Sequence, residues 1–307
     1  MQFQYHYQKQ YPQQLKYFLK EQGISKGLLA KIKFQGGKIE VNDKIENVLY
    51  ELTFGDMIQI TIPPEGEHET VLLDETPIDI VYEDAHILVV NKPANVASIP
   101  AQYHPNGTMA NRVKAYYKRQ NYVNQVIHVV TRLDRDTSGL MVFAKHGFAH
   151  AKLDCQLRNK QFIKRYQALV TGQIKQLKVH GQIELPIARD LDSLLKRKVD
   201  ESGKYAKTEY WRKKCNETLA LVDIQLHTGR THQIRVHFAA IGCPLRGDEL
   251  YGGVVDEEMS RQALHCYELQ FTHPFTGEVL HFKQEMPADM AHLAQKLSNT
   301  QSNPDFS

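Results

Sequence analysis

The beginning of the chain changes from helical to strand-like spacing of its hydrophobic positions. Apolar residues within 15–19 and 24–32 recur as they would on one face of a helix. After a pair of glycines, residues 38–42 and 54–60 alternate apolar with polar side chains, and Asn42-Asp43 is a typical tight-turn sequence. The pattern predicts a small unit of two helices followed by short strands.

From residue 78 onward, short apolar segments separated by polar loops replace this pattern. No segment repeats at a fixed period, and strands do not alternate regularly with helices, which favours an α+β fold. The predicted strands are 78–82, 87–92, 165–170, 205–215, 219–227 and 278–282, and the predicted helices are 109–119, 148–158 and 231–241.

Composition is that of a folded globular protein. The 307 residues are 42% hydrophobic and 24% charged, which excludes intrinsic disorder as the main state and suffices for about two domains. The four cysteines are widely spaced, and no apolar run approaches the roughly 20 residues that cross a bilayer. We expect a cytoplasmic protein without a membrane span or a disulfide scaffold.

Charge is segregated along the chain, although the formal net charge is only +3. Residues 65–84 contain eight acids and no Lys or Arg, which predicts a solvated acidic linker. Residues 85–144 carry 7 basic and 2 acidic side chains, and residues 145–214 carry 17 and 7. This basic block predicts a cationic face that attracts polyanions. The alternative is that basic residues such as those at 196–198 form one solvated loop.

The first segment that could carry chemistry is 127–145. Asp134 and Asp136 lie among Arg132 and Arg135, immediately before a short apolar strand. A carboxylate beside arginines stays ionised and is available as a nucleophile or base. The alternative is a structural turn with surface ion pairs.

The second segment, 226–237, predicts a helix entered after Gly229 with Thr231 as its N-cap. The helix would bring His232 and Arg235 near one face, and an inward arginine is a candidate partner for a buried carboxylate. The histidines at 227, 232 and 237 recur every five residues, unlike the pair of a zinc helix, so no metal site is expected.

The third segment is a predicted strand in 162–172. Alternation places Lys164 and Tyr166 on one strand face. Tyr166 is either a filler of the core or a platform on which a base stacks.

Together, R-L-D-R-D-T-S-G-L-M-V-F-A-K, K-R-Y-Q-A-L-V-T-G and T-G-R-T-H-Q-I-R-V-H resemble, in the same order, the motifs of the RluA-type pseudouridine synthases. The resemblance covers roughly residues 78–290. It implies a central mixed, mostly antiparallel β-sheet flanked by helices, and an isomerisation of uridine that needs no cofactor.

The resemblance also implies roles for individual residues. Asp134 matches the catalytic aspartate, and Tyr166 the tyrosine that stacks on the target base. Arg235 matches the arginine that pairs with the catalytic carboxylate. Arg132 would occupy the gap left by the flipped uridine, with Lys164 as a further RNA contact. Thr131 departs from the family, where histidine is frequent, and we expect this to change packing rather than chemistry.

Residues 24–60 resemble the small RNA-binding domain first described in ribosomal small-subunit protein four. The resemblance implies a small α/β domain whose phosphate contacts are Lys26, Lys31, Lys33 and Lys38. A solvated cap of helices and strands is the alternative. We therefore expect an RNA-binding domain at 1–64, an acidic linker at 65–77, a catalytic domain at 78–297 and a polar tail at 298–307.

The expected function is pseudouridine synthesis in structured RNA by a monomer, with large-subunit ribosomal RNA as the expected target. Transfer RNA is an alternative target. A non-catalytic RNA-binding protein on the same fold is a second alternative, and a hydrolase that uses Asp134 and Asp136 as paired carboxylates is a third. The hydrolase requires both carboxylates to face one cavity, and substituting each in turn distinguishes it from the synthase.

Overall fold

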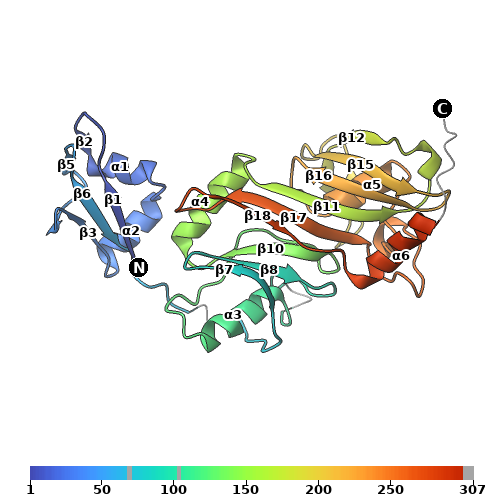
Figure 1. Ribbon diagram of the computed structural model, residues 1–307, viewed down its shortest axis with the longest axis horizontal. Helices are drawn as coiled ribbons and strands as arrows, with labels where there is room; N and C mark the ends of the chain where they lie inside the picture. Colours follow the sequence, from blue (N-terminus) through green and yellow to red (C-terminus); the bar gives the residue numbers. More distant parts are fainter. Residues whose placement is uncertain (68–70, 102–104, 300–307) are drawn as a thin grey trace.

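A computed structural model describes residues 1–67, 71–101 and 105–299. Figure 1 shows a small N-terminal sheet with its helices beside one end of a much larger sheet. No helix in the described part of the chain is long and apolar enough to cross a membrane.

The small unit is built as its hydrophobic pattern predicts. Helices α1 (Leu15–Glu21) and α2 (Lys26–Phe34) are confirmed, and Asn42 and Asp43 both have left-handed backbones, as a tight turn requires. The sequence pattern did not predict the first strand, which lies at the edge of the antiparallel sheet. Its strands in order are β1 (Gln2–His6), β6 (Met57–Thr61), β3 (Lys38–Val41) and β4 (Lys44–Ile45), and β2 (Gln13–Gln14) pairs separately with β5 (Glu51–Leu52).

The large sheet is mixed, because β10 and β17 run parallel while its other neighbouring strands are antiparallel. This confirms the expected α+β class and the mostly antiparallel sheet. Its strands in order are β12 (His180–Glu184), β15 (Lys207–Cys215), β16 (Ala220–Leu226), β11 (Ile163–Val170), β17 (Leu264–Thr272), β10 (Ser138–Ala144), β8 (Ile87–Lys92) and β7 (Asp79–Glu83), with β18 (Val279–Lys283) on β17 and β9 (His128–Val129) on β10.

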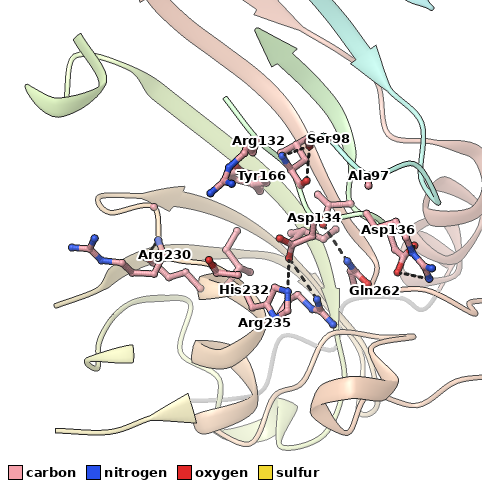
Figure 2. Close-up of a pocket in the computed structure, with 18 of the residues that line it drawn as sticks. Ala97, Ser98, Arg132, Asp134, Asp136, Tyr166, Arg230, His232, Arg235 and Gln262 are labelled. Atoms are coloured by element: carbon pink, nitrogen blue, oxygen red, sulfur yellow. Dashed lines mark hydrogen bonds and ion pairs between the residues drawn. The ribbon is translucent and has the colours of Figure 1, made fainter. Parts of the chain in front are cut away.

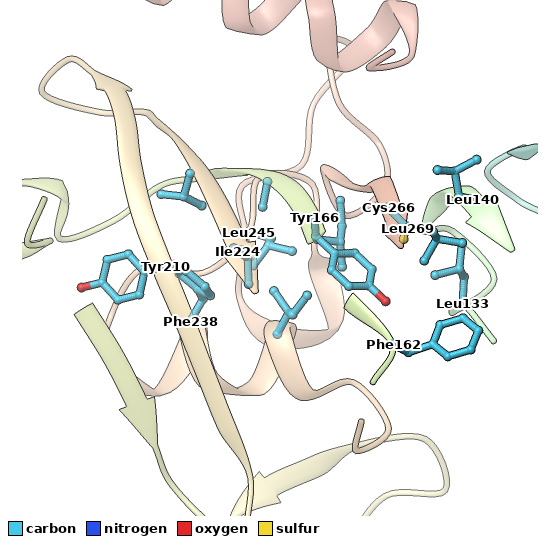
Figure 3. Close-up of a cluster of buried hydrophobic side chains, with 14 of the residues drawn as sticks. Leu133, Leu140, Phe162, Tyr166, Tyr210, Ile224, Phe238, Leu245, Cys266 and Leu269 are labelled. Carbon is cyan, nitrogen blue, oxygen red and sulfur yellow. The ribbon is translucent and has the colours of Figure 1, made fainter. Parts of the chain in front are cut away.

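Both faces of this sheet are covered, which explains the continuous apolar runs in β8 and β10. One set of side chains packs with α4 (Gly147–Arg158) and α5 (Gln233–Ala240), and the alternate set packs with α3 (Met109–Arg119). Helix α6 (Ala288–Asn299) packs on Leu169 and Leu219. Figure 3 shows the first of these clusters, which surrounds Tyr166.

Several predictions of elements need correction. The helices predicted at 109–119 and 148–158 are confirmed, but α6 and the central strand β17 were not predicted. In β17, His265 and Glu268 interrupt the apolar pattern, yet both are buried because they have polar partners. Residues 197–199 form β14, paired with β13 (Ile187–Arg189), rather than a loop.

We expected the acidic segment after residue 64 to be solvated, but two of its side chains form ion pairs with α3. Asp74 lies 3.2 Å from Arg112, and Glu75 lies 3.2 Å from Arg119, both on α3. Residues 68–70 and 300–307, which belong to the predicted linker and polar tail, are outside the described residues, and α6 continues to Asn299. The acids therefore fasten this segment to the larger unit.

An aromatic cluster joins the two units. Phe3 of β1 packs within 4.9 Å of the Phe275 ring and 5.1 Å of the Phe148 ring, measured between centroids. Glu65 accepts hydrogen bonds from His128 Nε2 at 2.6 Å and from the Gly147 amide at 3.1 Å. These contacts hold the small unit against the end of the large sheet.

Candidate active site

A cavity of about 840 Å³ opens where the loop before β10 meets β11 and the start of α5. Its lining includes Arg132, Asp134, Lys164, Tyr166 and Arg235, which come from three segments far apart in the sequence. Figure 2 shows the side chains of Asp134, His232 and Arg235 directed toward one another within it. The structure thus brings together the residues that the three motifs singled out.

Asp134 faces a buried arginine. Its Oδ2 lies 3.5 Å from Arg235 Nη1, and the Asp134 side chain is 28% exposed. Arg235 is anchored from behind, because its Nε and Nη2 each donate to one carboxylate oxygen of Asp248 at 2.7 Å. Asp248 is buried and fixes the plane of the guanidinium, a rigid arrangement typical of bidentate pairs. No role for Asp248 was predicted from the sequence.

His232 is the second neighbour of Asp134, at 4.0 Å between Nε2 and Oδ2. Burial lowers the pKa of His232 from its ordinary value, which favours the neutral ring at neutral pH. Its Nδ1 lies 2.9 Å from the hydroxyl of Tyr251.

The predicted cap at Thr231 is wrong. His232 occupies the N-cap position of α5 with a left-handed backbone at φ 57°, and its side chain caps no backbone amide. Gln233 stabilises the turn before α5 instead, because its Oε1 accepts hydrogen bonds from the Thr228 hydroxyl and the Arg230 amide. The left-handed turn places the imidazole beside the loop of residues 130–137, which carries Asp134.

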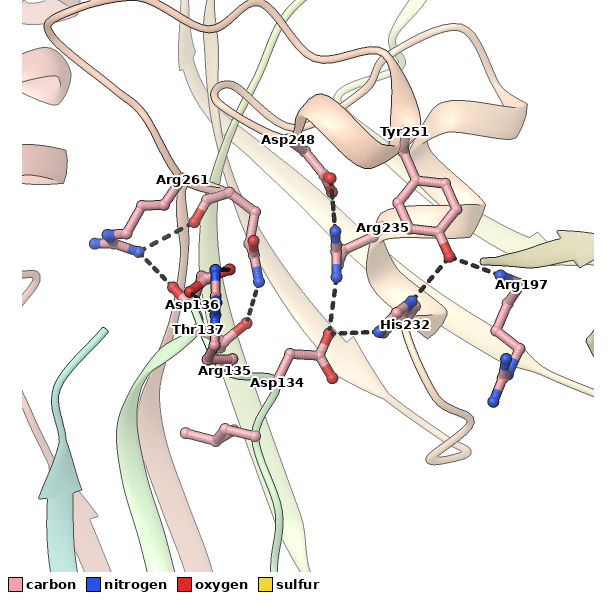
Figure 4. A network of polar contacts seen from close by, with 12 residues as sticks. Asp134, Arg135, Asp136, Thr137, Arg197, His232, Arg235, Asp248, Tyr251 and Arg261 are labelled. Carbon is pink, nitrogen blue, oxygen red and sulfur yellow. Dashed lines mark hydrogen bonds and ion pairs between the residues drawn. The ribbon is translucent and has the colours of Figure 1, made fainter. Parts of the chain in front are cut away.

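The carboxylate of Asp136 points away from that of Asp134. Its carboxylate accepts from Arg135 Nε at 2.8 Å and from Arg135 Nη2 at 3.2 Å. Figure 4 shows this pair on the opposite side of the loop from the group of Asp134, His232 and Arg235. Both aspartates line the broad cavity, so the requirement stated for the hydrolase alternative is met. Their partners differ, because Asp136 is paired with Arg135 whereas Asp134 faces Arg235 and His232.

Lys164 and Tyr166 lie on the same side of β11 and both reach the cavity wall. Tyr166 is 5% exposed and belongs to the hydrophobic core, which confirms the first interpretation of this residue, while its role as a platform for a base stays a prediction. Burial raises the pKa of Tyr166 well above its usual value and lowers the pKa of Lys164. The phenol therefore stays protonated at neutral pH and can donate a hydrogen bond.

Lys92 supports the loop that carries Asp134 from inside the protein, a contact that was not predicted from the sequence. It is fully buried at the end of β8, and its Nζ donates to the carbonyls of Pro93 at 2.8 Å, Val96 at 2.6 Å and Arg135 at 2.8 Å. Burial lowers the pKa of Lys92 to about 7. A lysine that follows four apolar residues of a buried strand was the available signal.

Five of the six predicted RNA contacts are exposed, and the sixth, Lys164, is half-buried at the cavity wall. Arg132 is exposed at the cavity, and its guanidinium has no hydrogen-bond or ion-pair partner among the described residues. The small unit carries the other four, which are all exposed and none of which lines the cavity; Lys38 is paired with Glu40. These four are Lys26, Lys31, Lys33 and Lys38.

Within the described ranges, no group of three or more His, Cys, Asp or Glu side chains is arranged to hold a metal ion. Of the three regularly spaced histidines, His227 bonds Glu209 and His237 lies buried between Thr208 and the Leu185 carbonyl. Each of these two therefore has a structural partner.

Residues 86–240 match the family model described as RNA pseudouridylate synthase. The uncharacterized RNA pseudouridine synthase YjbO of Bacillus subtilis (strain 168) is 44% identical over 279 residues, covering 91% of this chain and 97% of that protein. Ribosomal large subunit pseudouridine synthase D of Neisseria meningitidis (serogroup A, strain Z2491) is 36% identical, covering 85% of this chain and 72% of that protein. The chain therefore belongs to the RNA pseudouridylate synthase family. It is an isomerase that acts on RNA.

Among solved structures, human RNA pseudouridylate synthase domain containing 4 superimposes with a TM-score of 0.58. The two proteins are 21% identical, and the match covers 72% of this chain and 93% of the human one. At this identity the likeness shows a shared fold. The family match begins at residue 86, so the RNA-binding role of the small unit stays a prediction.

Proposed function

We propose that this enzyme isomerises uridine in large-subunit ribosomal RNA, with Asp134 as its catalytic residue. The observation that carries the assignment is the position of the Asp134 carboxylate, which is partly exposed in the cavity and faces the anchored Arg235 at 3.5 Å. The positive guanidinium stabilises the ionised carboxylate, the form that can attack or accept a proton. The relatives named for the large ribosomal subunit support the choice of RNA.

The reaction breaks the bond between the ribose C1′ and N1 of uracil and forms a bond from C1′ to C5. The proton on C5 is lost and N1 gains one, so atoms and electrons balance without an oxidant or reductant. Asp134 is the group placed to stabilise or attack C1′ or the base. Tyr166 supplies a flat, protonated phenol on which the detached uracil can stack and turn.

A uridine inside a stacked helix cannot reach this cavity, so it must leave the stack, which costs a few kcal/mol. The guanidinium of Arg132 is exposed at the cavity and has no ion-pair partner in the described part of the chain, so it is suited to fill the gap. Lys164 contributes a further donor at the wall. We assign both residues to RNA binding.

The small unit increases affinity for RNA in this proposal. The exposed Lys26, Lys31 and Lys33 of α2 and Lys38 of β3 are available to phosphates, which set register rather than read sequence. The sequence resemblance to the domain of ribosomal small-subunit protein four supports this assignment. We further propose that the enzyme acts as a monomer in the cytoplasm.

Pseudouridine mapping tests the function and the residue together. Total RNA from cells with the gene intact, deleted, or carrying Asp134→Asn is labelled with carbodiimide and read by primer extension, with Asp136→Asn as the matched control. We expect particular large-subunit sites to disappear in the deletion and Asp134→Asn strains and to persist in Asp136→Asn. Loss of transfer RNA sites instead would replace the proposed substrate. Persistence in Asp134→Asn would refute the catalytic assignment.

A further inference from the structure

The segment 261–266, which leads into β17, runs beside the proposed catalytic loop (residues 130–137) just after Asp134. Arg261 Nη1 donates to the Asp136 carbonyl at 3.0 Å, and Gln262 Nε2 donates to the Thr137 hydroxyl at 3.3 Å. The pairing then continues into the parallel strands β10 and β17, where Ser138 lies opposite His265. Figure 4 shows Arg261 reaching the loop on the side opposite Arg235.

The two backbones approach so closely that one position admits only glycine. Gly139 has φ 114°, and a Cβ atom there would lie 2.2 Å from the Cys266 carbonyl oxygen. Ser138, the preceding residue, shares a 2.9 Å hydrogen bond between its Oγ and His265 Nδ1. The end of the catalytic loop is therefore held at a fixed distance from the start of β17.

Arg261 is oriented by the C-terminal helix. Its Nε and Nη2 donate to the two oxygens of Asp289 at 2.8 and 2.9 Å, and Arg261 is 7% exposed. Asp289 lies in the first turn of α6, where its Oδ1 also accepts from the Met290 amide at 2.8 Å. Such a bidentate pair fixes the guanidinium plane and leaves Nη1 directed at the carbonyls of Asp136 and Gln262.

The helix that supplies Asp289 is itself fixed by apolar contacts. Met290, Leu293 and Leu297 are buried against Leu169 of β11 and Leu219 before β16. A chain of rigid contacts thus runs from the large sheet through α6, Asp289 and Arg261 to the backbone two residues after Asp134.

We infer that Arg261 is a positioning residue for Asp134, and that Asp289 of α6 holds Arg261 in the orientation that this task requires. The inference rests on the proposed role of Asp134 as the catalytic residue. Arg261 also lines the cavity, but its guanidinium is taken up by Asp289 and by the Asp136 carbonyl, so we assign it to positioning and not to contact with the reacting atoms. It fixes the carbonyl of Asp136, and with it the path of the loop that aims the Asp134 carboxylate at the substrate.

The chain offers a closely matched control for Asp289. Asp256 pairs with Arg246 and also accepts backbone amides, and its side chain is 42% exposed against 40% for Asp289. Neither Arg246 nor Asp256 lines the catalytic cavity. Asp289→Asn and Asp256→Asn therefore remove equivalent charges, of which only one bears on the catalytic loop.

Steady-state kinetics on an RNA substrate, together with thermal unfolding, test the inference. We expect Asp289→Asn to lower kcat about tenfold with little change in KM, because a misplacement of about 1 Å can cost up to a hundredfold in rate. Asp256→Asn should keep kcat within twofold of the wild type. A rise in KM at constant kcat, or an equal fall in kcat for both variants, would overturn the inference.

Conservative replacements separate positioning from a loss of folding. Asp289→Glu keeps the carboxylate and should recover part of kcat. Arg261→Lys should retain more of kcat than Arg261→Gln, although an ammonium group cannot form the two-pronged pair. If all of these fell together with the melting temperature, the role would be structural only. The proposed function fails separately, through Asp134→Asn: turnover by that variant would refute the catalytic assignment whatever the Asp289 variants do.

Discussion

The loop that carries Asp134 (residues 130–137) and the small N-terminal unit use positive charge in opposite ways. Around the loop, Lys92, Arg235 and Arg261 are buried, and each donates at least three hydrogen bonds or ion-pair contacts to fixed acceptors. On α2, the lysines at 26, 31 and 33 are exposed and have no ion-pair partner among the described residues.

The buried cations fix the geometry of the loop, whereas the exposed lysines attract RNA. A buried, fully bonded cation is screened little by salt and fixes the position of its neighbours, whereas an exposed lysine attracts phosphates over a distance that salt shortens. Changes near the loop should therefore act on kcat and be insensitive to ionic strength. Changes on the small unit should act on RNA affinity and its salt dependence.

The largest effect is expected from Asp248→Asn. This change leaves the buried guanidinium of Arg235 without its bidentate carboxylate, and breaking a buried pair costs about 3–5 kcal/mol of stability. Since Arg235 also faces Asp134, we expect kcat to fall by roughly a hundredfold. Kinetics and urea unfolding measure both effects. A variant that was less stable but kept its kcat would show that Asp134 does not depend on the orientation of Arg235.

The next effect is expected from Lys92→Met, through a change in pH dependence. Protonated Lys92 has three N–H donors for the carbonyls of Pro93, Val96 and Arg135, and neutral Lys92 has only two. One of the three carbonyls therefore loses its donor as the pH rises through about 7, the lowered pKa of Lys92, and the support of the loop through Arg135 weakens. Asp134 and Asp136 favour the charged form, and Arg112 and Arg261 oppose it. We expect a wild-type kcat that declines on the alkaline side.

The variant should lack this decline and have a kcat lowered by roughly tenfold at pH 6. Stability changes in the other direction. Because the pKa of Lys92 is lower folded than unfolded, the unfolded state binds more protons above about pH 7, and wild-type stability from this group rises toward pH 10. Melting temperatures of both proteins across this range measure it. Parallel pH profiles for kcat would contradict the prediction.

A moderate effect is expected from replacing Lys26, Lys31, Lys33 and Lys38 together with glutamine. RNA affinity should fall at low salt, and the slope of log K against log salt should become shallower by roughly 0.7 to 0.9 for each phosphate that is no longer neutralised. At saturating RNA, kcat should be unchanged. Each of the four lysines is also replaced singly with glutamine, and Lys44→Gln, at another exposed lysine of the small unit, is the control for these single variants. An unchanged salt slope would exclude phosphate binding by the small unit.

The smallest effect is expected from Phe3→Ala, which removes the ring that packs on Phe148 and Phe275 between the two units. Each aromatic contact contributes about 0.5–1.5 kcal/mol beyond area burial. We expect weaker protection of β1 from hydrogen exchange, a slightly higher KM and an unchanged kcat. Phe54→Ala, at a residue 63% exposed, is the control. A fall in kcat would show that the small unit also shapes the active site.

Much of the architecture could be predicted from local pattern. Helices α3 and α4 were placed correctly because their apolar positions recur at helical spacing, and β8 and β10 because their apolar runs are of strand length. Strand β17 was missed because the polar residues that it buries, His265 and Glu268, find their partners only in the folded sheet. Helix α6 was missed although its apolar face covers a core cluster.

The candidate site, like the fold, could be predicted from the sequence only in part. The sequence by itself determined the residue types and their order: an aspartate among arginines before a buried strand, a tyrosine and a lysine on one strand face, and an arginine near the start of a helix. The family resemblance also predicted that Arg235 pairs with Asp134, and the two side chains face each other in the structure. Only the tertiary structure decided that Asp248 anchors this arginine, and that Lys92 and Arg261 hold the loop from two sides. The contacts of Lys92 and Arg261 with the loop join residues 43 and 125 positions apart, and the contact of Asp248 with Arg235 depends on how the chain folds back after α5. Local spacing carries no information about either.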